Sequence, residues 1–284
     1  MHIFITGGTG FIGYHLIKKL LMDGYEISAL KRKGKLPLKF SKQNNITWIE
    51  GELGVGSLID IPNCDVVIHL AVAGAKYSSR NWEDCFKTNI LGVEDLIASI
   101  NSLEKKPMLF YPITYLEEID NYHKVFWNNP YVLTKKVATN FIKSWAKDCR
   151  DCKIIYGTFF QIYGANDNSK NVLSYIKDSL IKNVPAKLGS KNIYKDWLYV
   201  KDLIDGIIKS FIIHKKGIHY YDFGSGSLAR LDYVSNLLAS YLDRPKELLQ
   251  FNARAYSNNI KTKNFAKKFL PGWKPKYSLN EGIL

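Results

Sequence analysis

Short apolar runs alternate with stretches of helical periodicity along the first 160 residues of the chain. The runs are rich in β-branched and aromatic residues, which favour strands, and they span residues 2–6, 26–30, 46–50, 65–71, 108–111 and 153–160. Between several of them, for example at residues 12–21 and 90–100, apolar side chains recur every three or four positions, as on the buried face of a helix. The pattern predicts an α/β fold of the Rossmann type, a doubly wound parallel sheet with helices on both faces.

The pattern changes after about residue 160, where helical segments, loops and isolated strands follow one another. No Pro/Gly/Ser-rich linker, repeat or low-complexity tract separates the two parts. We therefore expect one chain with a smaller C-terminal substrate-binding lobe. The expected division is a dinucleotide-binding domain over residues 1–160 with part of 196–224, and a substrate lobe over 161–195 and 225–284.

A glycine-rich turn follows the first predicted strand. The segment "FITGGTGFIG" places Gly7, Gly10 and Gly13 at GxxGxxG spacing between that strand and an amphipathic helix. Glycines allow the backbone to approach a pyrophosphate, and the free N–H groups at a helix N-terminus stabilise the anion. In this βαβ context the spacing predicts a dinucleotide site.

The second strand ends in a basic segment, "SALKRKGK". A carboxylate commonly stands in this region when the cofactor is NAD, because it binds the ribose 2′-hydroxyl. Here the region holds no acid, and Lys31 and Arg32 are candidate partners for a 2′-phosphate. We predict NADP(H) as the cofactor; a merely basic loop at an NAD site is the alternative.

Tyr131 and Lys135 stand four positions apart in "NNPYVLTKKVA", directly after Pro130. Proline suits the first turn of a helix, so both side chains would project from one helical face. A free phenol has a pKa near 10, and a nearby ammonium lowers it by favouring the phenolate. Such a pair is suited to proton transfer at a carbonyl oxygen while hydride reaches its carbon.

Several motifs together carry a family resemblance. The segments "TGGTGFIG", "DVVIHLA", "FKTNILG", "PYVLTKK", "QIYGAND", "KDWLYVKDL" and "GWKPKYSLNEGI" occur in the order seen in the extended short-chain dehydrogenase/reductases, the NAD-dependent epimerase/dehydratase group that acts on nucleotide sugars. The compact length and the basic cofactor loop most resemble nucleotide-4-keto-6-deoxyhexose reductases of the CDP-abequose and CDP-paratose synthase type.

The resemblance implies roles for individual residues. Tyr131 would be the acid/base, Lys135 would orient the nicotinamide ribose and lower the pKa of Tyr131, and Asn89 would belong to the hydrogen-bond relay of the lysine. Other residues would contact the cofactor: Thr6, Gly7, Gly10, Phe11, Ile12 and Gly13 in the phosphate loop, Glu52 and Leu53 near the adenine, and Ala71 and Ala73 along the dinucleotide.

One expected residue of that family is missing. A Ser or Thr usually stands about two dozen residues before the tyrosine, whereas this chain reads "YPITYLEEI" in the corresponding strand. We predict that Thr114 polarises the carbonyl, with Tyr115 as the alternative. On the substrate side the resemblance implies that Lys195 and Arg254 contact the phosphates and that Gln161 contacts the substrate.

The net charge of +14 permits an anionic partner, but the lysines are dispersed along the chain, so we expect no nucleic-acid binding. Four scattered cysteines predict reduced thiols, and no cluster predicts a metal. The sequence contains no signal-like start and no apolar run near the roughly 18 residues that span a bilayer. We therefore expect a cytoplasmic protein without membrane partners and, from the resemblance, a homodimer.

These observations favour an NADPH-dependent reductase that acts on C4 of a nucleotide-linked 4-keto-6-deoxy or 3,6-dideoxy hexose in deoxysugar and O-antigen-type biosynthesis. A nucleotide-sugar 4-epimerase with retained NAD is the alternative. A dehydratase is disfavoured because the Asp-Glu pair of that chemistry is missing, with only Glu117 and Glu118 nearby. A non-catalytic NADPH-binding protein is the remaining class, and the intact Tyr131 and Lys135 argue against it.

Overall fold

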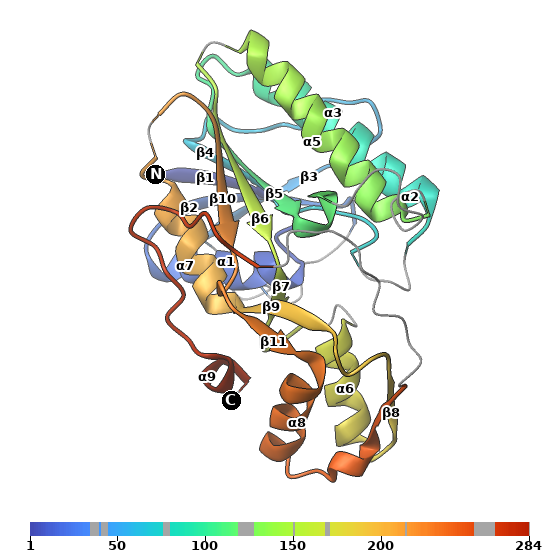
Figure 1. The fold of residues 1–284 in the computed structure, drawn as a ribbon. Coiled ribbons are helices and arrows are strands. Elements are labelled where there is room, and N and C mark those ends of the chain that lie inside the picture. Colours follow the sequence, from blue (N-terminus) through green and yellow to red (C-terminus); the bar gives the residue numbers. More distant parts are fainter. Residues whose placement is uncertain are drawn as a thin grey trace.

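A seven-stranded parallel sheet organises the computed structural model of the chain (Figure 1). The structure describes residues 1–34, 40, 45–75, 80–118, 128–149, 151–167, 171–213, 215–252 and 265–283. The strand order is β10-β6-β5-β4-β1-β2-β3. This confirms the predicted Rossmann-type sheet. The strands are β1 (His2–Thr6), β2 (Glu26–Lys31), β3 (Ile46–Glu50), β4 (Val66–His69), β5 (Met108–Thr114), β6 (Lys153–Phe159) and β10 (Gly217–Phe223).

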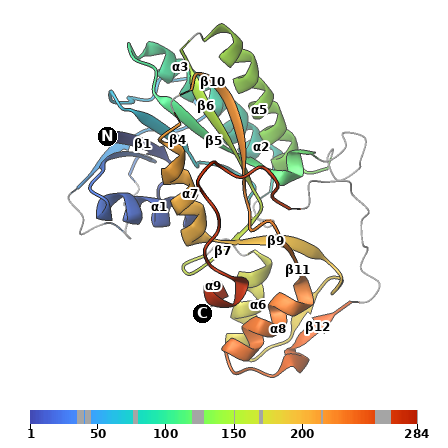
Figure 2. The same cartoon turned by 60° about the vertical axis from the view of Figure 1, so that its left-hand side comes forward.

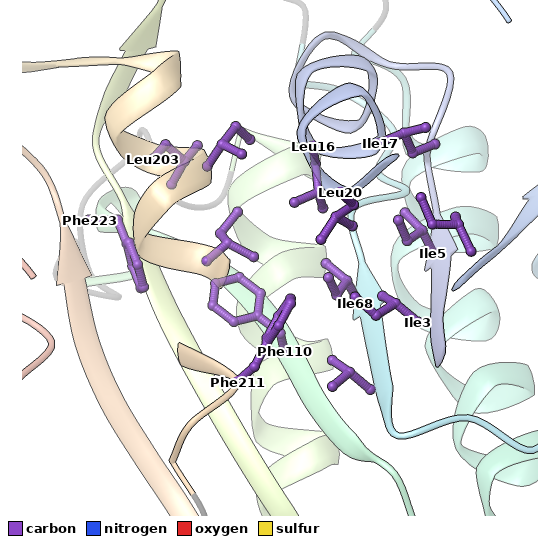
Figure 3. Close-up of a cluster of buried hydrophobic side chains, with 14 of the residues drawn as sticks. Ile3, Ile5, Leu16, Ile17, Leu20, Ile68, Phe110, Leu203, Phe211 and Phe223 are labelled. Atoms are coloured by element: carbon purple, nitrogen blue, oxygen red, sulfur yellow. The ribbon is translucent and has the colours of Figure 1, made fainter. Parts of the chain in front are cut away.

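Helices cover both faces of this sheet, as Figure 1 shows. Helices α1 (Phe11–Met22) and α7 (Val200–Ser210) lie on one face, and η3 (Lys87–Leu91), α3 (Gly92–Ser102) and α5 (Pro130–Asp148) lie on the other with the short α2 (Trp82–Phe86). Successive residues of a strand point to opposite faces, so Ile3 and Ile5 pack toward α1 whereas Phe4 packs toward α3. Figure 3 shows Leu16 and Leu20 of α1 and Leu203 of α7 in the first of these layers.

Smaller elements form the second part of the structure, at the bottom of Figure 2. A three-stranded sheet has the order β11-β9-β7, and β8 pairs with β12. Apolar residues of α6 and α8 form a separate core around Ile176, Leu180 and Val234. The bounds are β7 (Gln161–Tyr163), α6 (Val172–Ile181), β8 (Ala186–Leu188), β9 (Tyr194–Tyr199), β11 (Leu228–Arg230), α8 (Leu231–Tyr241), η5 (Lys246–Leu248), β12 (Leu249–Phe251) and α9 (Leu279–Ile283).

Three buried aspartates connect the C-terminal segment to the rest of the fold. Asp196 accepts a hydrogen bond from the backbone of Ala266, Asp202 accepts from the backbone of residues 276 and 277, and Asp222 accepts from that of residues 267 and 268. Each carboxylate is at most 2% exposed. Because buried carboxylates require partners, these contacts fix the path of the last described residues.

One prediction about the cysteines is wrong. Cys149 and Cys152 are joined by a disulfide, because the turn between α5 and β6 brings their Cα atoms to 5.5 Å. Cys64 and Cys85 are free, as predicted, and both are buried. None of the described helices combines the length and apolar character needed to cross a membrane.

Candidate active site

The turn between β1 and α1 has the geometry of an anion cradle. Gly7 has φ +73°, and a Cβ on Gly13 would lie 2.3 Å from the carbonyl oxygen of Gly7. Only glycine fits that close approach. Helix α1 begins at Phe11, and no side chain caps its first N–H groups. The loop can therefore accept a pyrophosphate, and its residues fit the predicted dinucleotide.

Hydrogen bonds join the ends of the neighbouring strands β1 and β4 beside this loop. The Thr6 hydroxyl bonds Nδ1 of His69 at 2.9 Å and accepts the N–H of Ala71 at 3.3 Å. Burial lowers the pKa of His69 to about 3, so its imidazole is neutral. These bonds hold Ala71 directly after β4, where the strand order reverses and dinucleotides bind in folds of this kind.

The basic residues at the end of β2 differ in their surroundings: Lys31 is paired with an acidic side chain, whereas Arg32 and Lys33 face solvent. The Lys31 ammonium is paired with the Glu50 carboxylate of the neighbouring strand, and this pairing lowers the pKa of Glu50. Arg32 and Lys33 are exposed. The sequence placed Lys31 and Arg32 together as phosphate partners, whereas the structure leaves Arg32 as the stronger candidate.

The predicted adenine and relay residues have other partners in this structure. The exposed Glu52 carboxylate accepts a hydrogen bond from Lys87 at 2.6 Å, and Leu53 is buried. Asn89 is buried on η3, where its amide pairs with both backbone groups of Ala73 at 2.8 and 3.1 Å. It also donates to the Thr134 hydroxyl at 2.9 Å. Asn89 therefore fixes the Ala73 loop and contacts the neighbour of Lys135.

Helix α5 brings Tyr131 to the end of β5. The helix begins at Pro130 because the Asn129 side chain caps the N–H of Val132 and proline suits the first helical position. The Tyr131 hydroxyl hydrogen-bonds the side chain of Thr114, the last residue of β5. The short separation of Thr114 and Tyr131 along the sequence therefore does not prevent their contact, because the end of β5 sets the position of Thr114.

The pKa of Tyr131 is raised to about 12, mainly by burial and secondly by the negative charge of Glu117. The bond to Thr114 and the charge of Arg80, whose guanidinium lies 5.6 Å from the ring centroid, oppose this increase. The net direction is opposite to the lowering expected from Lys135. The phenol therefore holds its proton at neutral pH, as a proton donor must.

Lys135 lies on the same face of α5 and is 6% exposed. Its ammonium donates to the Pro112 carbonyl at 2.7 Å and lies 3.8 Å from the centroid of the Tyr111 ring. Burial lowers the pKa of Lys135 to about 8, and the negative charge of Glu117 acts in the opposite direction. A cation therefore lies one helical turn from Tyr131.

Sequence reasoning missed the part that Glu117 takes in the site. Thr114 precedes the short 3-10 helix η4 (Tyr115–Glu118), and its hydroxyl accepts the N–H of Leu116. The Glu117 carboxylate reaches back to the N–H of Thr114 at 3.0 Å. This is the reciprocal arrangement of a capping box, and the S/T-x-x-E spacing of "TYLE" is the signal that predicts it.

Two substrate-side candidates, Lys195 and Gln161, lie on the smaller elements. Lys195 on β9 donates to the Tyr115 hydroxyl at 2.7 Å, and Tyr115 stacks on Phe160 with centroids 5.5 Å apart. Gln161 is the first residue of β7 and is partly exposed. Arg254 lies outside the described residues. Within the described part of the chain, no group of three or more His, Cys, Asp or Glu residues has a metal-site arrangement.

Residues 3–220 match the family model described as the NAD dependent epimerase/dehydratase family. The chain belongs to this family. It is 23% identical to CDP-abequose synthase of Salmonella muenchen over 99% of this chain and 95% of that protein. It is also 23% identical to a putative UDP-glucose 4-epimerase of Methanocaldococcus jannaschii, over 99% and 95% of the two chains.

Solved structures of family members share the fold. The structure of UDP-glucose 4-epimerase of Thermotoga maritima with UDP-glucose superposes with a TM-score of 0.82 at 20% identity, covering 100% of this chain and 96% of that one. The dTDP-glucose 4,6-dehydratase of Bacillus anthracis in complex with NAD gives 0.78 at 19% identity, covering 100% and 94%. Membership and the arrangement at the strand ends identify an enzyme of the oxidoreductase type.

Proposed function

We propose that this protein is an NADPH-dependent reductase of the C4 keto group of a nucleotide-linked 4-keto-6-deoxy or 3,6-dideoxy hexose, in deoxysugar or O-antigen-type biosynthesis. One observation carries the proposal. A protonated Tyr131 is hydrogen-bonded to Thr114 at the end of β5, with the Lys135 ammonium one helical turn away. These are the groups that reduction of a carbonyl requires.

The roles follow from the chemistry of each group. The nicotinamide supplies the hydride when the cofactor is bound. The Thr114 hydroxyl donates a hydrogen bond to the carbonyl oxygen and so polarises it, and Tyr131 gives its proton to that oxygen as negative charge develops there. The Lys135 ammonium stabilises the phenolate that remains. Because the pKa of Tyr131 is about 12, the protonated form predominates before the reaction.

The choice of NADPH rests on the end of β2. A 2′-phosphate would be repelled by an unpaired carboxylate; residues 31–35 include no acid, and the neighbouring Glu50 carboxylate is paired with Lys31. The exposed Arg32 offers a planar guanidinium that can bind a phosphate through two hydrogen bonds, with Lys33 adding charge.

For the substrate we propose contacts from the smaller sheet. Lys195 carries three donors, of which the Tyr115 hydroxyl takes one, so the ammonium can also bind a diphosphate. Gln161 would contact the sugar and Arg254 the second phosphate. The similarity to CDP-abequose synthase over nearly the whole chain supports a substrate of this class.

The alternative is a nucleotide-sugar 4-epimerase with retained NAD. It is favoured by the equal similarity to a putative UDP-glucose 4-epimerase and by the NAD bound in several structures of the same fold. An epimerase oxidises and then reduces the same carbon, so Tyr131 would first have to lose its proton. The basic segment after β2 favours an exchangeable NADPH over a retained NAD.

Purified protein is mixed with NADPH or NADH and with CDP-, dTDP-, GDP- and UDP-linked 4-keto-6-deoxy sugars while nicotinamide absorbance is followed. Stoichiometric NADPH oxidation supports the reductase, whereas interconversion of epimers without net oxidation, with NAD retained by the purified protein, contradicts it. Tyr131→Phe should lower kcat about 10²- to 10⁴-fold and leave the Kd of NADPH nearly unchanged. Tyr233→Phe, on the exterior of α8, is the matched control.

We further propose that the protein is a homodimer that pairs through α2 and α5. Trp82 and Phe86 on α2, and Val137 and Phe141 on α5, are each 41–51% exposed. Large apolar side chains gathered on packed helices are typical of interfaces. Sedimentation of the wild type and of Phe141→Asp tests this: the variant should sediment as a monomer if the helices pair.

A further inference from the structure

We propose that Glu117 is a positioning residue of this active site: its carboxylate joins the Thr114 end of β5 to α5 and provides the counter-charge to the Lys135 ammonium. The inference rests on the function proposed above. It gives a role to a buried acidic side chain that the reaction itself does not use.

Glu117 accepts one hydrogen bond at each of its carboxylate oxygens. Its Oε1 accepts the N–H of Thr114 at 3.0 Å, and its Oε2 accepts the Thr139 hydroxyl at 2.7 Å. Thr114 ends β5, and Thr139 lies on α5 one turn beyond Lys135. A single side chain therefore connects the strand end that carries Thr114 to the helix that carries Tyr131 and Lys135.

The Glu117 carboxylate is buried. Glu117 is 7% exposed, and an isolated carboxylate in such a place is strongly destabilised. Burial raises the pKa of the Glu117 carboxyl above its ordinary value. The charge of Lys135 and the hydrogen bonds that the two oxygens accept from Thr139 and Thr114 act in the opposite direction and favour the ionised form. A carboxyl group buried beside Tyr131 and Lys135 costs stability, and buried titratable groups of this kind are enriched at functional sites.

Lysine and tyrosine side chains surround the Glu117 carboxylate. Lys135, Lys143 and Tyr131 face Glu117 from α5, Tyr111 from β5 and Tyr156 from β6.

Of these, the two lysines are the cations. Lys135 is the buried one, with a pKa lowered by burial to about 8, and Glu117 is the group that opposes this lowering. Without the anion, the ammonium would lose its proton at a lower pH. The negative charge of Glu117 also raises the pKa of Tyr131. Removing this charge therefore lowers the pKa of both groups.

Two variants separate charge from position. Glu117→Gln keeps the length of the side chain and removes the charge, whereas Glu117→Asp keeps the charge and withdraws it from Thr114. Glu118→Gln removes an identical charge from the exposed neighbouring position and is the control. Folding of each variant is checked by circular dichroism and by the Kd of NADPH.

The decisive measurement is an NMR titration of protein with lysine isotope-labelled at the ε carbon, in which Lys135→Met assigns the Lys135 resonance. We expect the Lys135 pKa to fall by about one unit or more in Glu117→Gln, by less than half as much in Glu117→Asp, and not at all in Glu118→Gln. An unchanged Lys135 pKa in Glu117→Gln overturns the proposal.

Enzyme assays test the positioning part. The alkaline limb of kcat should move to lower pH in Glu117→Gln, and kcat at its optimum should fall at least about tenfold in Glu117→Asp with the Kd of NADPH unchanged. Full kcat in Glu117→Asp contradicts the link to Thr114. If the wild-type protein reduces no 4-keto sugar, the proposed function is refuted. The NMR titration needs no substrate, so the Lys135 pKa still tests the role of Glu117 in that case.

Discussion

Asp196→Asn tests how the C-terminal segment and the substrate strand are held together. The Asp196 carboxylate on β9 is 1% exposed and accepts four hydrogen bonds. One oxygen accepts the N–H and hydroxyl of Ser225 at 2.6 and 2.7 Å, and the other accepts the N–H groups of Gly226 and Ala266 at 3.0 and 2.8 Å. The neighbouring residue is Lys195, the proposed phosphate ligand.

An amide has the shape of the carboxylate but cannot accept from both sides. If the NH₂ group faces Gly226 and Ala266, two backbone donors lose their acceptor. If it faces Ser225, the hydroxyl can turn to accept, and only one backbone N–H is left unpaired. The second orientation is the better one, and it removes one hydrogen bond to a charged group and weakens the others, at a cost of about 2–4 kcal/mol.

For a chain of this length, about 2–4 kcal/mol corresponds to a melting temperature lower by roughly 4–8 °C. Urea unfolding and differential scanning calorimetry measure the change. Asp151→Asn is the control, because Asp151 pairs with Lys216 at the exposed end of α5 and surface pairs contribute little. The Kd of NADPH should not change, since the glycine loop lies on the other sheet. Equal stability of Asp196→Asn and Asp151→Asn would refute the reasoning.

Three further predictions follow from the site. Thr114→Val should lower kcat about 10²-fold while Thr114→Ser keeps most of it; equal activities would assign the carbonyl contact to another group. Arg32→Ala should weaken NADPH binding about tenfold at low salt and leave NADH binding unchanged, whereas Lys105→Ala, at the opposite end of the sheet, should affect neither; calorimetric titration decides. The folded-state pKa of His69, about 3, lies below its ordinary value, so the unfolded chain takes up the proton first. The stability contributed by this neutral histidine is complete above about pH 6.5 and is lost toward pH 3, at up to about 1.4 kcal/mol per pH unit. His69→Asn should flatten this part of the stability curve, and an unaltered slope contradicts the assignment.

The fold was predictable because its signals are local. Each of the six apolar runs singled out in the first part of the chain forms a strand of the large sheet. The main difference is β5, which continues through Pro112 to Thr114 rather than ending at residue 111. Proline is rare inside sheets because it lacks an N–H donor. Here β4 pairs with β5 only as far as Phe110, so Pro112 has a strand partner on the β6 side alone.

The site was predictable only in part. The glycine loop and the Tyr131–Lys135 pair each lie within one short segment, and a motif can indicate them. Other contacts join distant residues, such as the bond between Lys195 and Tyr115 across 80 positions. Sequence spacing holds no information on such contacts until the strand ends have been placed in space. The pairing of Lys31 with Glu50 was missed for the same reason, because it depends on the register of two strands.

The unequal lengths of neighbouring strands explain why Thr114, Tyr131 and Lys135 gather at one strand end. Strand β4 ends at His69, whereas its neighbour β5 continues to Thr114. The last residues of β5 are therefore without a β4 partner, and Lys135 donates to the Pro112 carbonyl in this stretch. The same projecting strand end carries Thr114 to Tyr131 and places Glu117 against α5.

On the other side of β4 lies β1 with the glycine loop, and between these two strands the order of the sheet reverses. A dinucleotide that crosses this point reaches from the glycines to the projecting end of β5. The early end of β4 therefore leaves the Pro112 carbonyl accessible to Lys135. An insertion that lengthened β4 until it paired with Pro112 would displace Lys135, even though Tyr131 and Lys135 themselves were unchanged.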